Sequence, residues 1–267
     1  MRVAAYQAPL LPSGSTEVAV RLIRERVAWC ESEGVDILCC PEGVLGGLAD
    51  YGLLPTAFAI DVERGQLDAV LAPLASDRVT TIVGFTESAP RGRLYNAAAI
   101  LQGGSVVGVY RKLYPAINRS VYAPGNRIPV FTVGDLTFGI LICRDSTYQE
   151  PARTMAEQGA VALFVPTNNG MPPTKGGPHL VAAARAVDIA RAIENSVAVV
   201  RADVAGRTGT LVSDGSSGIV DRSGAVLTSA RRLEADLVVA DIETRPRERR
   251  RIDAARNSVA SNKNVPE

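Results

Sequence analysis

The chain has 267 residues, enough for one large α/β domain or two small ones, and no change in composition and no Ser/Pro-rich linker divides it. Lys and Arg number 29 against 28 Asp and Glu, which gives a formal net charge of +1, and aromatic residues make up 5%. This balance provides neither a strong positive field nor many stacking platforms, and no apolar run is long enough to span a bilayer, so we expect neither nucleic acid nor a membrane as partner. We expect a single domain over 1–267 whose tail, from about residue 245, is basic and polar.

Helices and strands are interspersed along the chain. Apolar residues recur at helical spacing over 15–34, 65–76, 150–159 and 178–195. Short apolar runs predict strands over 2–7, 36–41, 79–86, 95–101, 105–110, 136–143, 160–165, 196–202, 217–221 and 235–241. Short turns such as Gly103-Gly104 separate the strands of 79–110, which favours hairpins there. The pattern therefore predicts an α/β fold with a mixed sheet and helices on the outside.

The cysteines indicate a reducing compartment. The four cysteines are Cys30, Cys39, Cys40 and Cys143. Two of them are adjacent, and none are spaced as Cys-x-x-Cys. No signal peptide precedes the early strand 2–7, so we expect a cytoplasmic protein without a disulfide framework. No cluster of metal-ligating residues stands out, and we expect neither metal nor organic cofactor.

Three predicted strands end at residues that carry chemistry. Cys143 ends the apolar run 136–143 and is followed by polar residues, Glu42 follows the strand 36–41, and Lys112 follows the strand 105–110. Because α/β proteins bind ligands at the carboxyl ends of their strands, a thiol, a carboxylate and an ammonium can converge on one site.

This trio can perform nucleophilic catalysis. Cysteine hydrolases usually recruit a histidine as base, and the single histidine, His179, lies at the opening of a predicted helix. Glu42 can serve as the base instead. Lys112 would favour the thiolate and stabilise the oxyanion that forms when the thiolate attacks a carbonyl carbon.

The ordered trio resembles the nitrilase superfamily of carbon–nitrogen hydrolases, whose catalytic Glu, Lys and Cys occur in that order. The motifs that carry the resemblance are Cys-Pro-Glu42-Gly, Tyr-Arg-Lys112-Leu-Tyr-Pro and Phe-Gly-Ile-Leu-Ile-Cys143-Arg-Asp. The resemblance implies an αββα sandwich that pairs through its helices with a second subunit, which gives a four-layer homodimer or a larger assembly.

Two positions depart from the pattern of that family. Members commonly carry a second glutamate in the loop after the lysine, where this chain has Asn118, which can hydrogen-bond Lys112 but cannot hold a negative charge. The residue after the cysteine, often Tyr, Asn or Trp, is Arg144. The nitrile-cleaving branch typically reads Cys-Trp-Glu, whereas Cys143-Arg144-Asp145 is closer to the Cys-x-Asp of amidases and carbamoylases, which favours an amide substrate.

Four residues are candidates for substrate binding: Arg144, Asn118, Asn168 and Asn169. Arg144 could clamp a substrate carboxylate, or it could form an ion pair with Asp145 or Glu150. Asn168 and Asn169 follow the strand 160–165 and could line the pocket or form a simple turn.

We therefore expect a cysteine-dependent hydrolase of non-peptide carbon–nitrogen bonds that acts through a thioester on a small amide or an N-carbamoyl compound. Nitrile hydrolysis, acyl transfer to an amine and a catalytically silent ligand-binding protein remain open as alternatives.

Overall fold

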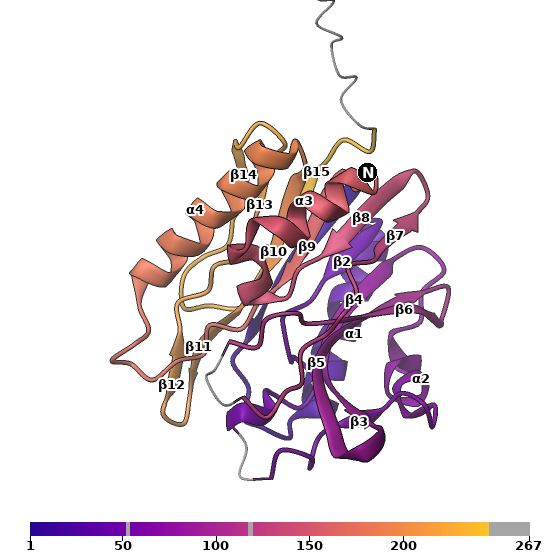
Figure 1. The fold of residues 1–267 in the computed structure, drawn as a ribbon, viewed down its shortest axis with the longest axis vertical. Helices are drawn as coiled ribbons and strands as arrows, with labels where there is room; N and C mark the ends of the chain where they lie inside the picture. The colour runs from indigo at the N-terminus through magenta and orange to yellow at the C-terminus, as the bar shows by residue number, and fades with distance from the viewer. Residues whose placement is uncertain (52–53, 117–119, 246–267) are drawn as a thin grey trace, which may run out of the picture.

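The computed structural model describes residues 1–51, 54–116 and 120–245. Asn118 and most of the predicted basic tail lie outside the described residues. Two mixed β-sheets pack face to face, and helices cover their outer faces (Figure 1). The predicted α/β class with mixed sheets is confirmed, and its layers form an αββα sandwich. Pairing with a second subunit stays a prediction.

Within the described residues, the larger sheet has nine strands in the order β12-β11-β1-β2-β4-β5-β6, with β15 paired to β1 and β3 to β4. Strand β1 lies in the middle of it, parallel to β2 and antiparallel to β15. The predicted hairpins are present, because β4, β5 and β6 are successively antiparallel. The bounds are β1 Arg2–Pro9, β2 Ile37–Cys39, β3 Ile60–Asp61, β4 Thr80–Ala89, β5 Arg93–Gln102, β6 Ser105–Arg111, β11 Val204–Thr208, β12 Leu211–Ser213 and β15 Asp236–Asp241.

The smaller sheet has six strands in the described part of the chain, in the order β14-β13-β10-β9-β8-β7. Its centre is parallel, since β9 runs parallel to both β8 and β10, while β7, β13 and β14 are added antiparallel. The bounds are β7 Val130–Val133, β8 Leu136–Ile140, β9 Ala162–Pro166, β10 Ala198–Ala202, β13 Gly218–Val220 and β14 Val226–Ser229.

Four α-helices are formed by the described residues: α1 Thr16–Ser32, α2 Gln66–Leu71, α3 Gln149–Glu157 and α4 Pro178–Asn195. Short 3-10 turns complete the set: η1 Ala49–Tyr51, η2 Ala72–Leu74, η3 Pro90–Gly92 and η4 Cys143–Thr147. Helix α4 starts with a proline in its first turn, where a backbone N–H would have no intrahelical hydrogen-bond acceptor. It ends before Ser196, which adopts the left-handed conformation. None of the described helices has both the length and the apolar character needed to cross a membrane.

Side-chain alternation on β1 separates two hydrophobic cores. Val3 and Ala5 face the smaller sheet and join the core between the two sheets, which continues to α3 and α4. Ala4 and Tyr6 face the opposite way and pack in the core beneath α1 and α2. This period of two is expected for a strand buried on both faces.

The sequence missed several short strands and extended others, such as 36–41 and 136–143, beyond their ends. Strands β3, β7, β11, β12 and β14 have at most five residues each, and their pairing partners define them better than their own patterns do. The predicted strand 136–143 ends at Ile140, so Leu141 and Ile142 lead Cys143 out of the sheet and into the turn η4.

Gly84 of β4 allows the segment that carries Glu42 to lie directly against the sheet. Cys40 and Leu45 donate backbone hydrogen bonds to the carbonyls of Ile82 and Gly84, at 2.8 and 3.2 Å. A Cβ atom on Gly84 would lie 2.3 Å from the carbonyl oxygen of Pro41 and 2.8 Å from Cα of Glu42. The position of Glu42 therefore depends on a residue without a side chain at 84.

Gly84→Ala should destabilise the fold by about 1–3 kcal/mol, because the added methyl group meets backbone rather than a movable side chain. Gly34→Ala is the control, since no heavy atom beyond the adjacent residues lies within 4 Å of its Cβ position and only its positive φ of 67° opposes the change. Urea unfolding of the two variants should show the larger loss for Gly84→Ala. A loss no larger than that of Gly34→Ala would contradict the close approach at residues 41–43.

Candidate active site

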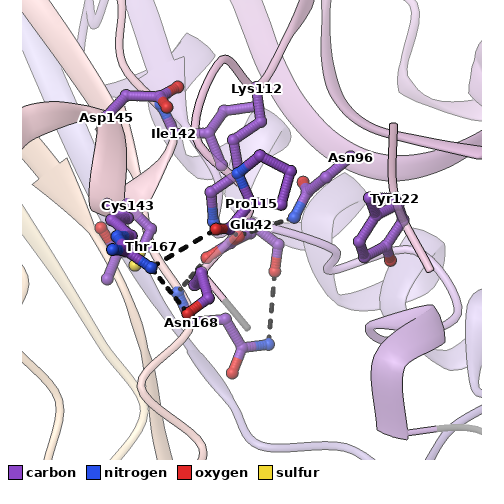
Figure 2. A network of polar contacts seen from close by, with 12 residues as sticks. Glu42, Asn96, Lys112, Pro115, Tyr122, Ile142, Cys143, Asp145, Thr167 and Asn168 are labelled. Carbon is purple, nitrogen blue, oxygen red and sulfur yellow. Dashed lines mark hydrogen bonds and ion pairs between the residues drawn. The ribbon is translucent and has the colours of Figure 1, made fainter. Parts of the chain in front are cut away.

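Strand ends from both sheets bring Glu42, Lys112, Cys143 and Asn168 together (Figure 2). Glu42 and Lys112 follow β2 and β6 of the larger sheet, which run in the same direction. Cys143 and Asn168 follow the parallel strands β8 and β9 of the smaller sheet. The carboxylate, ammonium and thiol that the sequence placed at strand ends thus lie in one cluster, with an amide from Asn168.

Glu42 is the most heavily bonded side chain of the cluster and is 2% exposed. Its Oε1 accepts hydrogen bonds from Nζ of Lys112 at 2.6 Å and from Nδ2 of Asn96 at 2.7 Å. Its Oε2 accepts from the backbone N–H of Asn168 at 3.0 Å. Two donors therefore occupy Oε1, whereas Oε2 keeps a lone pair that can accept a proton.

Lys112 is 3% exposed and is fixed through its backbone on both sides. Its N–H donates to the carbonyl of Asn96 at 2.8 Å, and its carbonyl accepts from Gly125 at 2.7 Å. Burial disfavours the ammonium, but the pKa of Lys112 is raised above its usual value, and the charge and hydrogen bond of Glu42 and the charge of Asp145 act in this direction. Lys112 is therefore a cation at neutral pH.

Cys143 begins the turn η4 with a φ of 48°, in the left-handed region that residues with a side chain rarely adopt. Its carbonyl accepts a hydrogen bond from Oγ of Ser146 at 2.7 Å, and Nη2 of the buried Arg201 donates to Oγ of Ser146 at 3.1 Å. Cys143 is partly exposed, whereas Cys30, Cys39 and Cys40 are buried, and all four thiols are free. A strained backbone at a residue of this kind is typical of functional sites.

The electrostatics of the cluster keep the thiol protonated. Burial, and next the carboxylate of Glu42, raise the pKa of Cys143 to about 12, while Lys112 and Arg201 act in the opposite direction. Lys112 lowers the pKa of the thiol, as the sequence predicted, but burial and Glu42 raise this pKa by more. For this sulfur to act as a nucleophile, a base would have to remove its proton.

The other predicted residues take different places. Arg144 directs its guanidinium to the carbonyl of Ala116, at 2.9 Å, rather than to Asp145 or Glu150. Asn169 donates from its side chain to Asp203 at 2.8 Å. His179 is exposed in the first turn of α4 and is not among the residues whose hydrogen bonds hold the side chains of Glu42 and Lys112.

Three buried residues were not identified from the sequence as part of the site. Asn96 supports Glu42, Asp145 accepts hydrogen bonds from the segments on either side, and Arg201 connects the ends of β9 and η4. A polar Asn96 within the apolar strand 95–101 was the available signal for the first. Among the described residues, no group of three or more His, Cys, Asp or Glu side chains is placed to hold a metal ion.

Comparisons with known proteins find relatives that match this chain over most of its length. The chain is 30% identical to a nitrilase of Pyrococcus abyssi over 88% of this chain and 85% of the relative. It is 31% identical to an (R)-stereoselective amidase of a Pseudomonas species over 85% of this chain and 80% of the relative. It is 27% identical to a glutamine-dependent NAD(+) synthetase of Thermotoga maritima over 86% of this chain, but spans only 40% of that relative's length.

A solved structure extends the likeness to three dimensions. A glutamate-to-glutamine mutant of the amidase from Nesterenkonia sp. AN1, which carries acrylamide on its active-site cysteine, superposes with a TM-score of 0.75 at 25% identity. The match covers 92% of this chain and 94% of the amidase. The sequence model of the carbon–nitrogen hydrolase family matches residues 2–251, nearly the whole chain. The chain therefore belongs to the carbon–nitrogen hydrolase family, whose members include amidases and nitrilases.

Proposed function

We propose that this protein is an amidase that uses Cys143 as nucleophile, Glu42 as general base and Lys112 as oxyanion stabiliser. The observation that carries the proposal is the buried contact of 2.6 Å between Lys112 and Glu42 beside a protonated thiol on a strained turn. A thiol of this kind needs a base close by, and Oε2 of Glu42 has the free lone pair for it.

Acylation begins with transfer of the thiol proton to Oε2 of Glu42 as the sulfur attacks the amide carbon. The ammonium of Lys112 and the backbone N–H of Arg144, at the start of η4 where helical N–H groups have no intrahelical acceptor, stabilise the oxyanion. Collapse of this adduct breaks the carbon–nitrogen bond, and Glu42 gives its proton to the departing nitrogen. Ammonia or an amine leaves, and a thioester remains on Cys143.

Hydrolysis of the thioester reuses the same groups. Glu42 takes a proton from water, the resulting hydroxide attacks the thioester carbon, and Lys112 again faces the oxyanion. The carbon–sulfur bond then breaks, the sulfur recovers its proton from Glu42, and the acid is released. One carboxylate therefore acts as base and acid in both halves of the reaction.

The substrate we favour is a small carboxamide or N-carbamoyl compound that carries a carboxylate. Arg144 commits one nitrogen to Ala116, and its remaining N–H groups can bind a carboxylate. We propose that Asn168 and Asn169 line the pocket at the end of β9, with Asn169 oriented by Asp203. A nitrile remains the alternative within the family, in view of the nitrilase relative.

The terminal amide of glutamine is a second candidate. The similarity to the glutamine-dependent NAD(+) synthetase of T. maritima favours it, although this chain spans 40% of that protein. Glutamine has both features that the site is proposed to use, a primary amide and a carboxylate.

Ammonia release from a panel of simple amides, glutamine, asparagine, N-carbamoyl amino acids and nitriles tests the proposal. Cys143→Ala should lower every activity by at least about a thousandfold, because the covalent route is lost. Cys30→Ala, which removes a buried thiol from α1, should keep the activity of the wild type. Substantial turnover by Cys143→Ala would exclude the thioester mechanism.

The protonation state of the thiol can be measured directly. With a pKa raised to about 12, Cys143 should hold its proton at every pH well below that value, so no thiolate accumulates near neutrality. The difference in far-ultraviolet thiolate absorbance between wild type and Cys143→Ala should stay flat from about pH 6 to about pH 9. A step within that range would mean that Lys112 outweighs burial and that a standing thiolate attacks.

Asn118→Glu tests the departure from the family pattern. Glu42 already neutralises Lys112, and Asp145 also raises the pKa of this lysine, so a further carboxylate should change the turnover number by less than about tenfold. The measurement is ammonia release by the two proteins across the panel. A wild type that is inert until Asn118→Glu is introduced would overturn the enzyme assignment and favour a silent ligand-binding protein.

A further inference from the structure

A buried carboxylate lies between the segments that carry Lys112 and Cys143. Asp145 has no exposed surface. From the lysine side, its oxygens accept the hydroxyl of Tyr110 at 2.8 Å and the N–H groups of Tyr114 at 2.8 Å and Leu113 at 3.3 Å. From the cysteine side, they accept the N–H of Ile142 at 3.2 Å.

These donors bracket both reactive residues. Tyr110 precedes Lys112 by two residues, and Leu113 directly follows it, so the carboxylate fixes the chain on both sides of the lysine. Ile142 directly precedes Cys143, and the N–H of Asp145 returns a hydrogen bond to the carbonyl of Ile142 at 3.0 Å. A shift of this one carboxylate would therefore move the lysine and the thiol relative to each other.

The charge of Asp145 acts on Lys112 as well. Burial raises the pKa of Asp145 to about 6, although Lys112 and the hydrogen bonds from Tyr114 and Tyr110 act to lower it. Asp145 is therefore a carboxylate at neutral pH, and it adds to the negative charge that keeps Lys112 an ammonium.

Other contacts between the two segments lie nearer the surface. The rings of Tyr114 and Tyr148 stack with centroids 3.9 Å apart, and Arg144 donates to the carbonyl of Ala116. Both Tyr148 and Arg144 are exposed, so water can compete for these contacts. Asp145 instead offers acceptors where water is excluded, and hydrogen bonds to a buried charge are strong ones.

We propose that Asp145 is a positioning residue that sets the placement of Lys112 relative to Cys143 for the reaction. This inference rests on the proposed function and deepens it, because it assigns the alignment of oxyanion stabiliser and nucleophile to one buried group that touches neither substrate nor reacting atoms.

Asp145→Asn keeps the shape of the side chain but replaces one acceptor oxygen with a donor that faces N–H groups. It should lower kcat by about ten- to a hundredfold with KM within about twofold, because small misplacements act on the transition state. Glu87→Gln is the matched control. Glu87 is 2% exposed and accepts a hydrogen bond from Arg111, which lies next to Tyr110 on strand β6. It should keep kcat within about twofold of the wild type.

Hydrogen exchange gives a readout that does not depend on catalysis. The N–H groups of Leu113 and Tyr114 should exchange at least about tenfold faster in Asp145→Asn and at the wild-type rate in Glu87→Gln. If the wild type hydrolyses nothing in the panel, the proposed function fails, while faster exchange would still show that Asp145 holds this segment.

Two results would overturn the proposal. One is a folded Asp145→Asn protein whose kcat lies within twofold of the wild type, and the other is an equal loss of kcat in Glu87→Gln. If Asp145→Asn does not fold, Tyr110→Phe decides, because it removes one donor and leaves the carboxylate in place. Its kcat should fall at least about threefold at unchanged KM, and an unchanged kcat would refute the positioning role.

Discussion

The ion pair between Glu42 and Lys112 is the constraint on which the rest of the site depends. Both side chains are almost fully buried and 2.6 Å apart, so each charge is stable only while the other is present. Removal of one partner from such a pair typically costs about 3–5 kcal/mol. Asn96 and the N–H of Asn168 supply the further hydrogen bonds that a buried carboxylate requires.

The same pair determines how the thiol can react. Burial raises the pKa of Cys143, Glu42 raises it further, and Lys112 lowers it. The proposed enzyme therefore stores a neutral thiol beside a carboxylate with one free lone pair, instead of a standing thiolate. Such an arrangement limits oxidation and unwanted alkylation at rest, because the thiolate is the reactive species.

Residues with a local signature could be predicted from the sequence, and those that act through distant contacts could not. Cys143 ends a predicted apolar run and Glu42 and Lys112 follow two others, and α4 has the predicted bounds 178–195. Asn96 contacts Glu42 across 54 positions, and Asp145 meets Tyr110 across 35, so neither partner follows from local pattern. The short strand β7 and the β11–β12 hairpin were missed for the same reason, since sheet pairing defines them.

In the proposed mechanism, Cys143 carries a covalent acyl group during turnover. Acid quenching of the wild type during hydrolysis of its best amide, followed by mass spectrometry of the intact protein and its peptides, tests this most directly. We expect a mass increase equal to the acyl group, located on the peptide that contains Cys143. Steady turnover with no adduct, or with an adduct on another residue, would contradict it.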